Sequence, residues 1–84
     1  MELTVKLYGT LRKYRPVSIR GAPHQPFTIS IPENSTVNDL MRSLEVADGA
    51  VNATAVNGDA VEPNTLLHDG DTVSLFPPVA GGGV

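Results

Sequence analysis

The chain has 84 residues, a formal net charge of −3 and no cysteine, which fits one small domain and excludes disulfides, thiolate catalysis and cysteine-ligated zinc. No apolar run approaches the roughly 20 residues that span a bilayer. The N-terminus has no basic region followed by an apolar stretch, so we expect a cytoplasmic protein with no signal peptide and no membrane partner.

Charge is distributed unevenly along the chain. All six basic residues lie in the first half, and Arg42 is the last of them; six acidic residues and no base follow it. An acidic second half disfavours nucleic acid as a partner and suits a basic protein surface. A solvated acidic face accounts for the same charge as readily.

Two alternating segments in the first half predict β-strands. Residues 2–8 alternate between apolar and polar side chains, with Tyr8 on the outward side, and residues 26–31 place apolar side chains on one face. The two runs can pair as an antiparallel hairpin. Residues 9–25 contain two prolines and two glycines and predict a loop with one helical turn at residues 10–14. The sequence "LRKYR", with Arg20 nearby, is a local basic patch that could bind an anion or an acidic partner, but an ordinary charged loop explains it better.

The clearest helix is predicted at residues 36–46. Ser35 is the expected N-cap, Asp39 lies near the positive end of the helix dipole, and Gly49 is the expected stop. One apolar stripe with helical spacing is formed by Val37, Leu40, Met41 and Leu44.

The second half predicts three short strands. Residues 53–61 read as a strand, an Asn57-Gly58 turn and a return strand. In the last strand, residues 72–76, alternation places Phe76 on the side that the helix does not cover, together with Tyr8. An exposed aromatic beside a terminal tail predicts a docking surface, and a satellite core contact is the alternative. Because one helix has one apolar stripe, it must cover one face of one sheet, which is an α+β roll.

No catalytic or metal site is predicted. His24 and His68 lack further ligands at metal-binding spacing. The stretch "HDGD" at residues 68–71 lacks the rest of a calcium loop, so we expect solvated turn residues there. No nucleophile motif, such as Gly-x-Ser-x-Gly, is present. We therefore expect no catalytic residue and no bound cofactor.

The C-terminal sequence "LFPPVAGGGV" suggests a chemical role for the terminus. Glycine lacks a Cβ, so its backbone can enter a channel too narrow for a side chain. Pro77 and Pro78 stiffen the base of the segment, and residues 77–82 reach roughly 20 Å when fully extended. A glycine carboxylate is also the least hindered acyl group that a protein can offer. Disorder alone explains many glycine-rich termini.

The whole chain resembles the MoaD/ThiS family of β-grasp, ubiquitin-like sulfur carriers. The resemblance rests on "LYGTLRKY", "STVNDLMRSL" and "LLHDGDTVSLFPPVAGG", and it is strongest to MoaD-type proteins, the small subunits of molybdopterin synthase. It implies a mixed sheet of about five strands covered on one face by one main helix. It further implies a β-grasp domain at residues 1–76 and a flexible C-terminal tail at residues 77–84.

The resemblance also implies a function as a protein cosubstrate without catalytic residues. A ubiquitin-activating-type enzyme uses ATP to adenylate the terminal glycine, here Gly82, and sulfur then replaces AMP to give a thiocarboxylate. In the MoaD case the tail inserts into a MoaE-like large subunit, and the sulfur passes to a molybdopterin precursor. The expected partner-binding residues are Tyr8, Phe76, Pro77, Pro78, Val79 and Ala80, followed by the tail glycines Gly81, Gly82 and Gly83.

The chain departs from the family pattern because Gly83 and Val84 follow the usual Gly-Gly terminus. We expect a precursor that a JAMM-type metalloprotease cuts after Gly82; a cut after Gly83 is the alternative, and an extension that is never removed is the third possibility. A β-grasp interaction module, a protein modifier, or a sulfur carrier for thiamin or amino-acid synthesis are the alternative functions.

Overall fold

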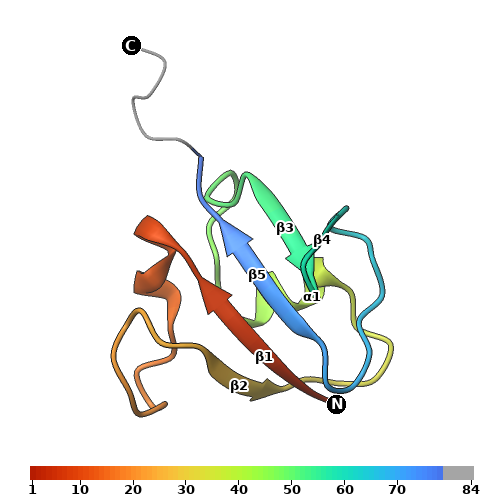
Figure 1. Ribbon diagram of the computed structural model, residues 1–84, viewed down its shortest axis with the longest axis horizontal. Coiled ribbons are helices and arrows are strands. Elements are labelled where there is room, and N and C mark those ends of the chain that lie inside the picture. The colour runs from red at the N-terminus through yellow and green to blue at the C-terminus, as the bar shows by residue number, and fades with distance from the viewer. Residues whose placement is uncertain (79–84) are drawn as a thin grey trace.

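The protein is described here by a computed structural model in which residues 1–78 are placed (Figure 1). One five-stranded sheet is covered on one face by the only α-helix of these residues. No helix within residues 1–78 has the length and apolar character that crossing a bilayer requires. In chain order the elements are β1 (Glu2–Leu7), the 3₁₀ helix η1 (Gly9–Tyr14), β2 (Phe27–Ser30), α1 (Val37–Ser43), β3 (Ala53–Val56), β4 (Asp59–Val61) and β5 (Thr72–Phe76).

The sheet has the mixed topology that the resemblance to the MoaD/ThiS family implies. Its strand order is β2-β1-β5-β3-β4, with β1 and β5 parallel at the centre and the other pairs antiparallel. The predicted hairpin of the first two strands is confirmed, with Leu3 opposite Ile29 and Val5 opposite Phe27. The β-grasp roll is thus confirmed, and the first and last strands lie side by side in its centre.

The core lies between the inner face of the sheet and α1, which runs behind the strands in Figure 1. Strict alternation in β1 and β5 sends every second side chain inward, and these side chains are almost completely buried. The helix adds its apolar stripe from the other side. The most deeply buried large side chains are Leu3, Val5, Leu11, Val37, Leu40, Val73 and Leu75.

The helix predicted at residues 36–46 is confirmed at Val37–Ser43, but its predicted N-cap and stop residues are wrong. The N-cap is Thr36, not Ser35: the Thr36 hydroxyl accepts a hydrogen bond from the backbone N–H of Asp39 (3.2 Å), and the Asp39 carboxylate accepts one from the Thr36 N–H (2.9 Å). Ser35 is buried and donates its hydroxyl to the carbonyl of Pro32 (2.7 Å). The helix ends at Ser43, well before Gly49, and Glu45 then takes a left-handed conformation (φ 57°).

Two predicted turns form, one of them with more structure than expected. Asn57 (φ 52°) and Gly58 (φ 89°) form the turn between β3 and β4, as predicted from residues that tolerate positive φ. In the "HDGD" stretch, the side chain of Asp71 is only 13% exposed. It accepts hydrogen bonds from the His68 N–H (2.8 Å) and the Asn57 side-chain amide (2.9 Å). These residues hold the start of β5 in place and are not merely solvated.

Candidate functional site

An aromatic pair lies where the chain leaves β5. Tyr8 directly follows β1 and Phe76 ends β5. Because these strands are parallel and Leu7 lies opposite Leu75, the residues that follow share one face of the sheet. The two rings stack with centroids 4.7 Å apart and planes inclined by 11°. The prediction that Tyr8 and Phe76 lie on the same outer side is confirmed.

The pair belongs to the surface opposite the helix. Tyr8 is 37% exposed and Phe76 is half-buried, whereas the neighbouring Leu75 points inward and is 0% exposed. Phe76 packs on Tyr8 and is not part of the buried cluster beneath the sheet. The satellite-core alternative is therefore not needed to explain Phe76, and its ring has the surface position that docking requires.

The backbone around Phe76 is fixed on both sides. The Tyr8 N–H donates to the carbonyl of Leu75 (3.2 Å), and the Asn52 N–H donates to the carbonyl of Phe76 (2.8 Å). Since neighbouring strands hold the last residues of β5 in this way, the direction in which the chain leaves the sheet is set by β1 and β3.

Gly9 contributes to the site in a way that sequence reasoning missed. Its backbone is left-handed (φ 55°), and a Cβ at this position would lie only 3.0 Å from Cγ of Pro77. A side chain here would be strained and would push against the proline ring. Glycine thus lets Pro77 rest, half-buried, on the turn after β1, while Pro78 is exposed. The signal in the sequence was a glycine directly after an outward-facing aromatic at a strand end.

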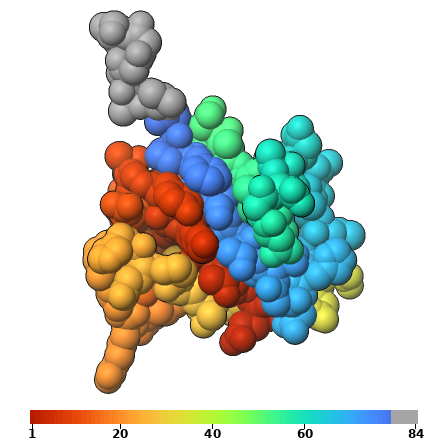
Figure 2. Space-filling model, in the orientation of Figure 1, coloured from red at the N-terminus to blue at the C-terminus, as the bar shows by residue number. Residues whose placement is uncertain are grey.

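Small side chains continue the outer face beside the aromatic pair. Ala53 lies opposite Phe76, and Ala55 lies opposite Ser74. On the other side of β5, Lys6 lies opposite Ser74 and adds one positive charge. Figure 2 shows this face, on which β1, β5 and β3 run side by side without a covering helix. An aromatic pair next to small, mostly uncharged side chains suits contact with an apolar protein surface.

Part of the predicted site lies outside the described residues. This applies to Val79, Ala80, Gly81, Gly82, Gly83 and Val84, and so to most of the predicted tail at residues 77–84. Within residues 1–78, no group of three or more histidine or acidic side chains is placed to hold a metal ion. Of the predicted partner-binding residues, the structure therefore brings together Tyr8, Phe76 and Pro77, with Pro78 following.

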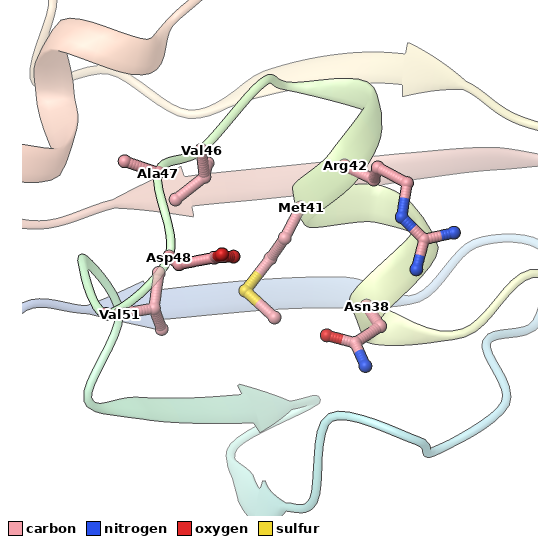
Figure 3. A pocket seen from close by; sticks show the side chains of 8 residues that line it. Asn38, Met41, Arg42, Val46, Ala47, Asp48 and Val51 are labelled. Atoms are coloured by element: carbon pink, nitrogen blue, oxygen red, sulfur yellow. The ribbon is translucent and has the colours of Figure 1, made fainter.

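A pocket of about 220 Å³ between α1 and residues 46–51 offers no acid–base pair (Figure 3). Met41 lies between Asp48 and Arg42 in this view. Arg42 pairs with Asp39 instead, at 3.5 Å. The hydrogen bonds from the Thr36 backbone and hydroxyl, helped by Arg42, hold the pKa of Asp39 below its ordinary value of 3.8. These charges stabilise the start of the helix and belong to no reactive centre.

Comparison with known proteins supports one family over almost the whole chain. Residues 5–82 match the sequence model of the ThiS family. Small archaeal modifier protein 3 of Haloferax volcanii is 28% identical over 99 aligned residues, which cover 98% of this chain and 100% of that protein.

Two solved structures resemble this chain over nearly its full length. One is a chain of the complex of subunits 1 and 2 of the molybdopterin-converting factor of Helicobacter pylori, which is 28% identical to this chain with a TM-score of 0.60. The match covers 98% of this chain and 100% of that one. The thiamine biosynthesis protein ThiS of Geobacter metallireducens is 26% identical with a TM-score of 0.59 and the same coverage. These relatives differ in the roles that their names state.

Proposed function

The chain belongs to the ThiS family of small ubiquitin-like carriers and modifiers, and we propose that it is a sulfur carrier whose terminal glycine donates sulfur in molybdopterin biosynthesis. The observation that carries the proposal is the stacked Tyr8–Phe76 pair at the point where the chain leaves β5. The pair supports the proposal because its rings are partly exposed next to the segment that would enter a partner's active site. The family match supports the same assignment because it extends through Gly82.

The proposed chemistry takes place at the carboxylate of Gly82. One carboxylate oxygen attacks the α-phosphate of ATP, which gives an acyl-adenylate and releases pyrophosphate. A sulfide equivalent then attacks the acyl carbon and displaces AMP, so that a C–S bond replaces the C–O bond to phosphate. The thiocarboxylate sulfur attacks a carbon of the pterin precursor and displaces an oxygen leaving group, which gives a thioester. Water then hydrolyses the acyl C–S bond, so that the sulfur stays on the precursor and the carboxylate is restored. Because glycine has no side chain, its acyl carbon is accessible to the sulfide and then to water.

On this proposal the catalytic groups belong to partner proteins. A ubiquitin-activating-type enzyme binds ATP and forms the adenylate, and a MoaE-like large subunit of molybdopterin synthase receives the tail. The Helicobacter pylori complex of the two subunits of the molybdopterin-converting factor supports such a pairing. This chain contributes the acyl terminus and the docking surface, as a cosubstrate and not as an enzyme, and we propose that it acts in the cytoplasm.

Removal of the last two residues is part of the proposal. Val84 would present a branched side chain in the place where the chemistry requires an unhindered glycine. A JAMM-type metalloprotease that hydrolyses the Gly82–Gly83 bond would free the carboxylate of Gly82, and a cut after Gly83 is the alternative register. Both registers leave the residues of the docking surface unchanged.

The second candidate function is protein modification. The similarity to small archaeal modifier protein 3 favours it, because the same adenylated glycine can acylate a lysine amine when no sulfur is supplied. A sulfur carrier for thiamin or amino-acid synthesis is a further alternative, which the similarity to a thiamine biosynthesis protein supports. All of these functions use the same terminus and differ in the acceptor.

The intact mass of the protein from its native cells tests the proposal. We expect loss of Gly83 and Val84, with sulfur in place of one oxygen at the new terminus. The matched experiment offers chains that end at Gly82, Gly83 and Val84 to the activating enzyme and measures pyrophosphate release; only the first should be a good substrate. A full-length chain without sulfur under sulfur demand would overturn the carrier proposal, whereas equal adenylation of all three chains would overturn the proposed removal of Gly83 and Val84. Isopeptide conjugates without thiocarboxylate would favour the modifier.

A further inference from the structure

The loop of residues 15–26, between η1 and β2, is held in shape by one half-buried arginine, Arg15. The guanidinium of Arg15 donates to the carbonyls of Ile19 and Arg20, both at 2.7 Å. It also lies 5.4 Å from the centre of the Phe27 ring, in a cation–π contact. We call residues 15–26 the basic loop. Its conformation is fixed by these Arg15 contacts, whereas many surface loops have few internal contacts.

Gly21 shows how closely this network is packed. Its φ is +116°, and a Cβ there would lie 2.8 Å from Nη2 of Arg15 and 2.6 Å from the side-chain oxygen of Gln25. That oxygen accepts a hydrogen bond from the Ala22 N–H at 2.8 Å. Only glycine lets the arginine and the glutamine approach the backbone at this point. The basic loop is therefore built around Arg15 and Gly21.

Three other cations of this region are left without an acidic partner. Arg12, Lys13 and Arg20 are exposed, and none of them forms an ion pair within residues 1–78. Arg42, by contrast, pairs with Asp39. Because the six basic residues of the chain include these three, the basic loop and η1 carry a local positive charge on a protein whose net charge is negative.

A partly apolar hollow lies beside two of these cations, Arg12 and Lys13. Residues of η1 and the basic loop line a pocket of about 330 Å³, and its lining includes the apolar side chains of Pro16, Val17 and Ile19. Val17 is 105% exposed, so its whole side chain is available to a partner. A concave apolar wall beside exposed cations suits an apolar side chain that is flanked by carboxylates.

We propose that the basic loop is a second docking surface, which binds an acidic peptide segment of a partner protein. Charge complementarity with the exposed cations favours an acidic occupant. The net charge of −3 favours a short segment over a long one. A long polyanion such as nucleic acid would extend from the basic loop over the acidic part of the chain and be repelled there. A short segment contacts the basic loop alone and places one apolar side chain against Val17.

The 3₁₀ helix η1 connects the basic loop to the aromatic pair along the chain. The basic loop lies beside the β2 edge of the sheet (Figure 1), whereas η1 begins directly after Tyr8 and contacts β5. The second surface goes beyond the proposed sulfur transfer, since it would add an acidic partner to the proteins that bind the C-terminal segment.

Peptide titration of the full chain, followed by NMR, tests the proposal. The probe is the peptide Glu-Glu-Glu-Leu-Glu-Glu-Glu, with capped ends, and its glutamine counterpart is the control. We expect amide shifts confined to η1 and the basic loop, weakened by added salt and absent with the glutamine peptide. Arg20→Glu should weaken binding about tenfold, because it replaces a positive charge with a negative one. The Arg20 side chain makes no hydrogen bond within residues 1–78, so this variant should keep its fold.

Matched variants separate a local site from an effect of net charge. Arg42→Glu changes the net charge equally but lies on α1, and Phe76→Ala removes the aromatic pair; both should leave peptide binding within about twofold. Equal losses in Arg20→Glu and Arg42→Glu, shifts outside the basic loop and η1, or no shift at all would overturn the proposal. Tighter binding to a single-stranded DNA oligomer or to phosphatidylserine vesicles would overturn the protein partner. Failure here leaves the sulfur-carrier proposal untouched.

Discussion

Replacing Phe76 with alanine tests the docking surface most directly. The ring stacks on Tyr8 at 4.7 Å on the uncovered face of the sheet, where a partner can reach it. Truncating an aromatic anchor at the centre of an interface typically costs about 1–2 kcal/mol or more of binding free energy, which is about a 5- to 30-fold rise in Kd. We expect this loss toward both proposed partners, the activating enzyme and the MoaE-like large subunit.

The same change should have a small effect on folding. A stacked aromatic pair contributes about 0.5–1.5 kcal/mol beyond the area it buries, and Phe76 is only half-buried. We therefore expect the free energy of unfolding to fall by about 1 kcal/mol, well below the roughly 3–5 kcal/mol of a fully buried phenylalanine. Tyr8→Ala should show a similar loss, and the double variant should reveal a coupling of about 0.5–1.5 kcal/mol.

Calorimetric titration and chemical denaturation on the same samples provide the two readouts. Two variants of β5 serve as controls. Leu75→Ala, at a 0% exposed core position, should cost about 2–5 kcal/mol of stability. Ser74→Ala, on the outer face of the strand, should change stability by less than about 0.5 kcal/mol.

The reasoning would be refuted by either of two results. A Phe76→Ala variant that loses about 3 kcal/mol or more of stability while Kd is unchanged would place the ring in the core. If Phe76→Ala left the free energy of unfolding unchanged and the double variant showed no coupling between Phe76 and Tyr8, the stack would not form in solution.

Three further predictions concern the start of α1 and the turn after β1. Thr36→Val removes the acceptor of the Asp39 N–H and should lower the unfolding free energy by about 1 kcal/mol in chemical denaturation; an unchanged midpoint would contradict the assigned cap. Because the folded-state pKa of Asp39 lies below its ordinary 3.8, its contribution is complete above that pH and is lost as the pH falls through the folded pKa. Asp39→Asn should therefore reduce the loss of unfolding free energy at acid pH. An unchanged pH dependence would show that the Asp39 carboxylate does not contribute to stability. Gly9→Ala should destabilise the fold by about 1 kcal/mol or more, and more than Gly49→Ala does, because only the former meets Pro77; equal losses would mean that the Pro77 contact is unimportant.

Local patterns in the sequence determined the elements and their faces. Alternation in residues 2–8 and 72–76 follows from the two-residue period of a strand, so it correctly placed Tyr8 and Phe76 on the outer side. The Asn57-Gly58 turn was predictable because few residues accept positive φ. The resemblance to the MoaD/ThiS family supplied the strand number and the single covering helix.

Only the tertiary structure decided which neighbours each group finds. Ser35 and Thr36 both carry a hydroxyl suited to capping, but the turn before α1 gives the Ser35 hydroxyl to the Pro32 carbonyl, which leaves Thr36 as the cap. The stack of Tyr8 on Phe76 depends on the parallel register of strands at opposite ends of the chain. The role of Arg15, which organises the basic loop through backbone carbonyls, depends on the path of that loop. Short-range periodicity carries no information about such pairings, because they join residues whose separation in sequence is unrelated to their separation in space.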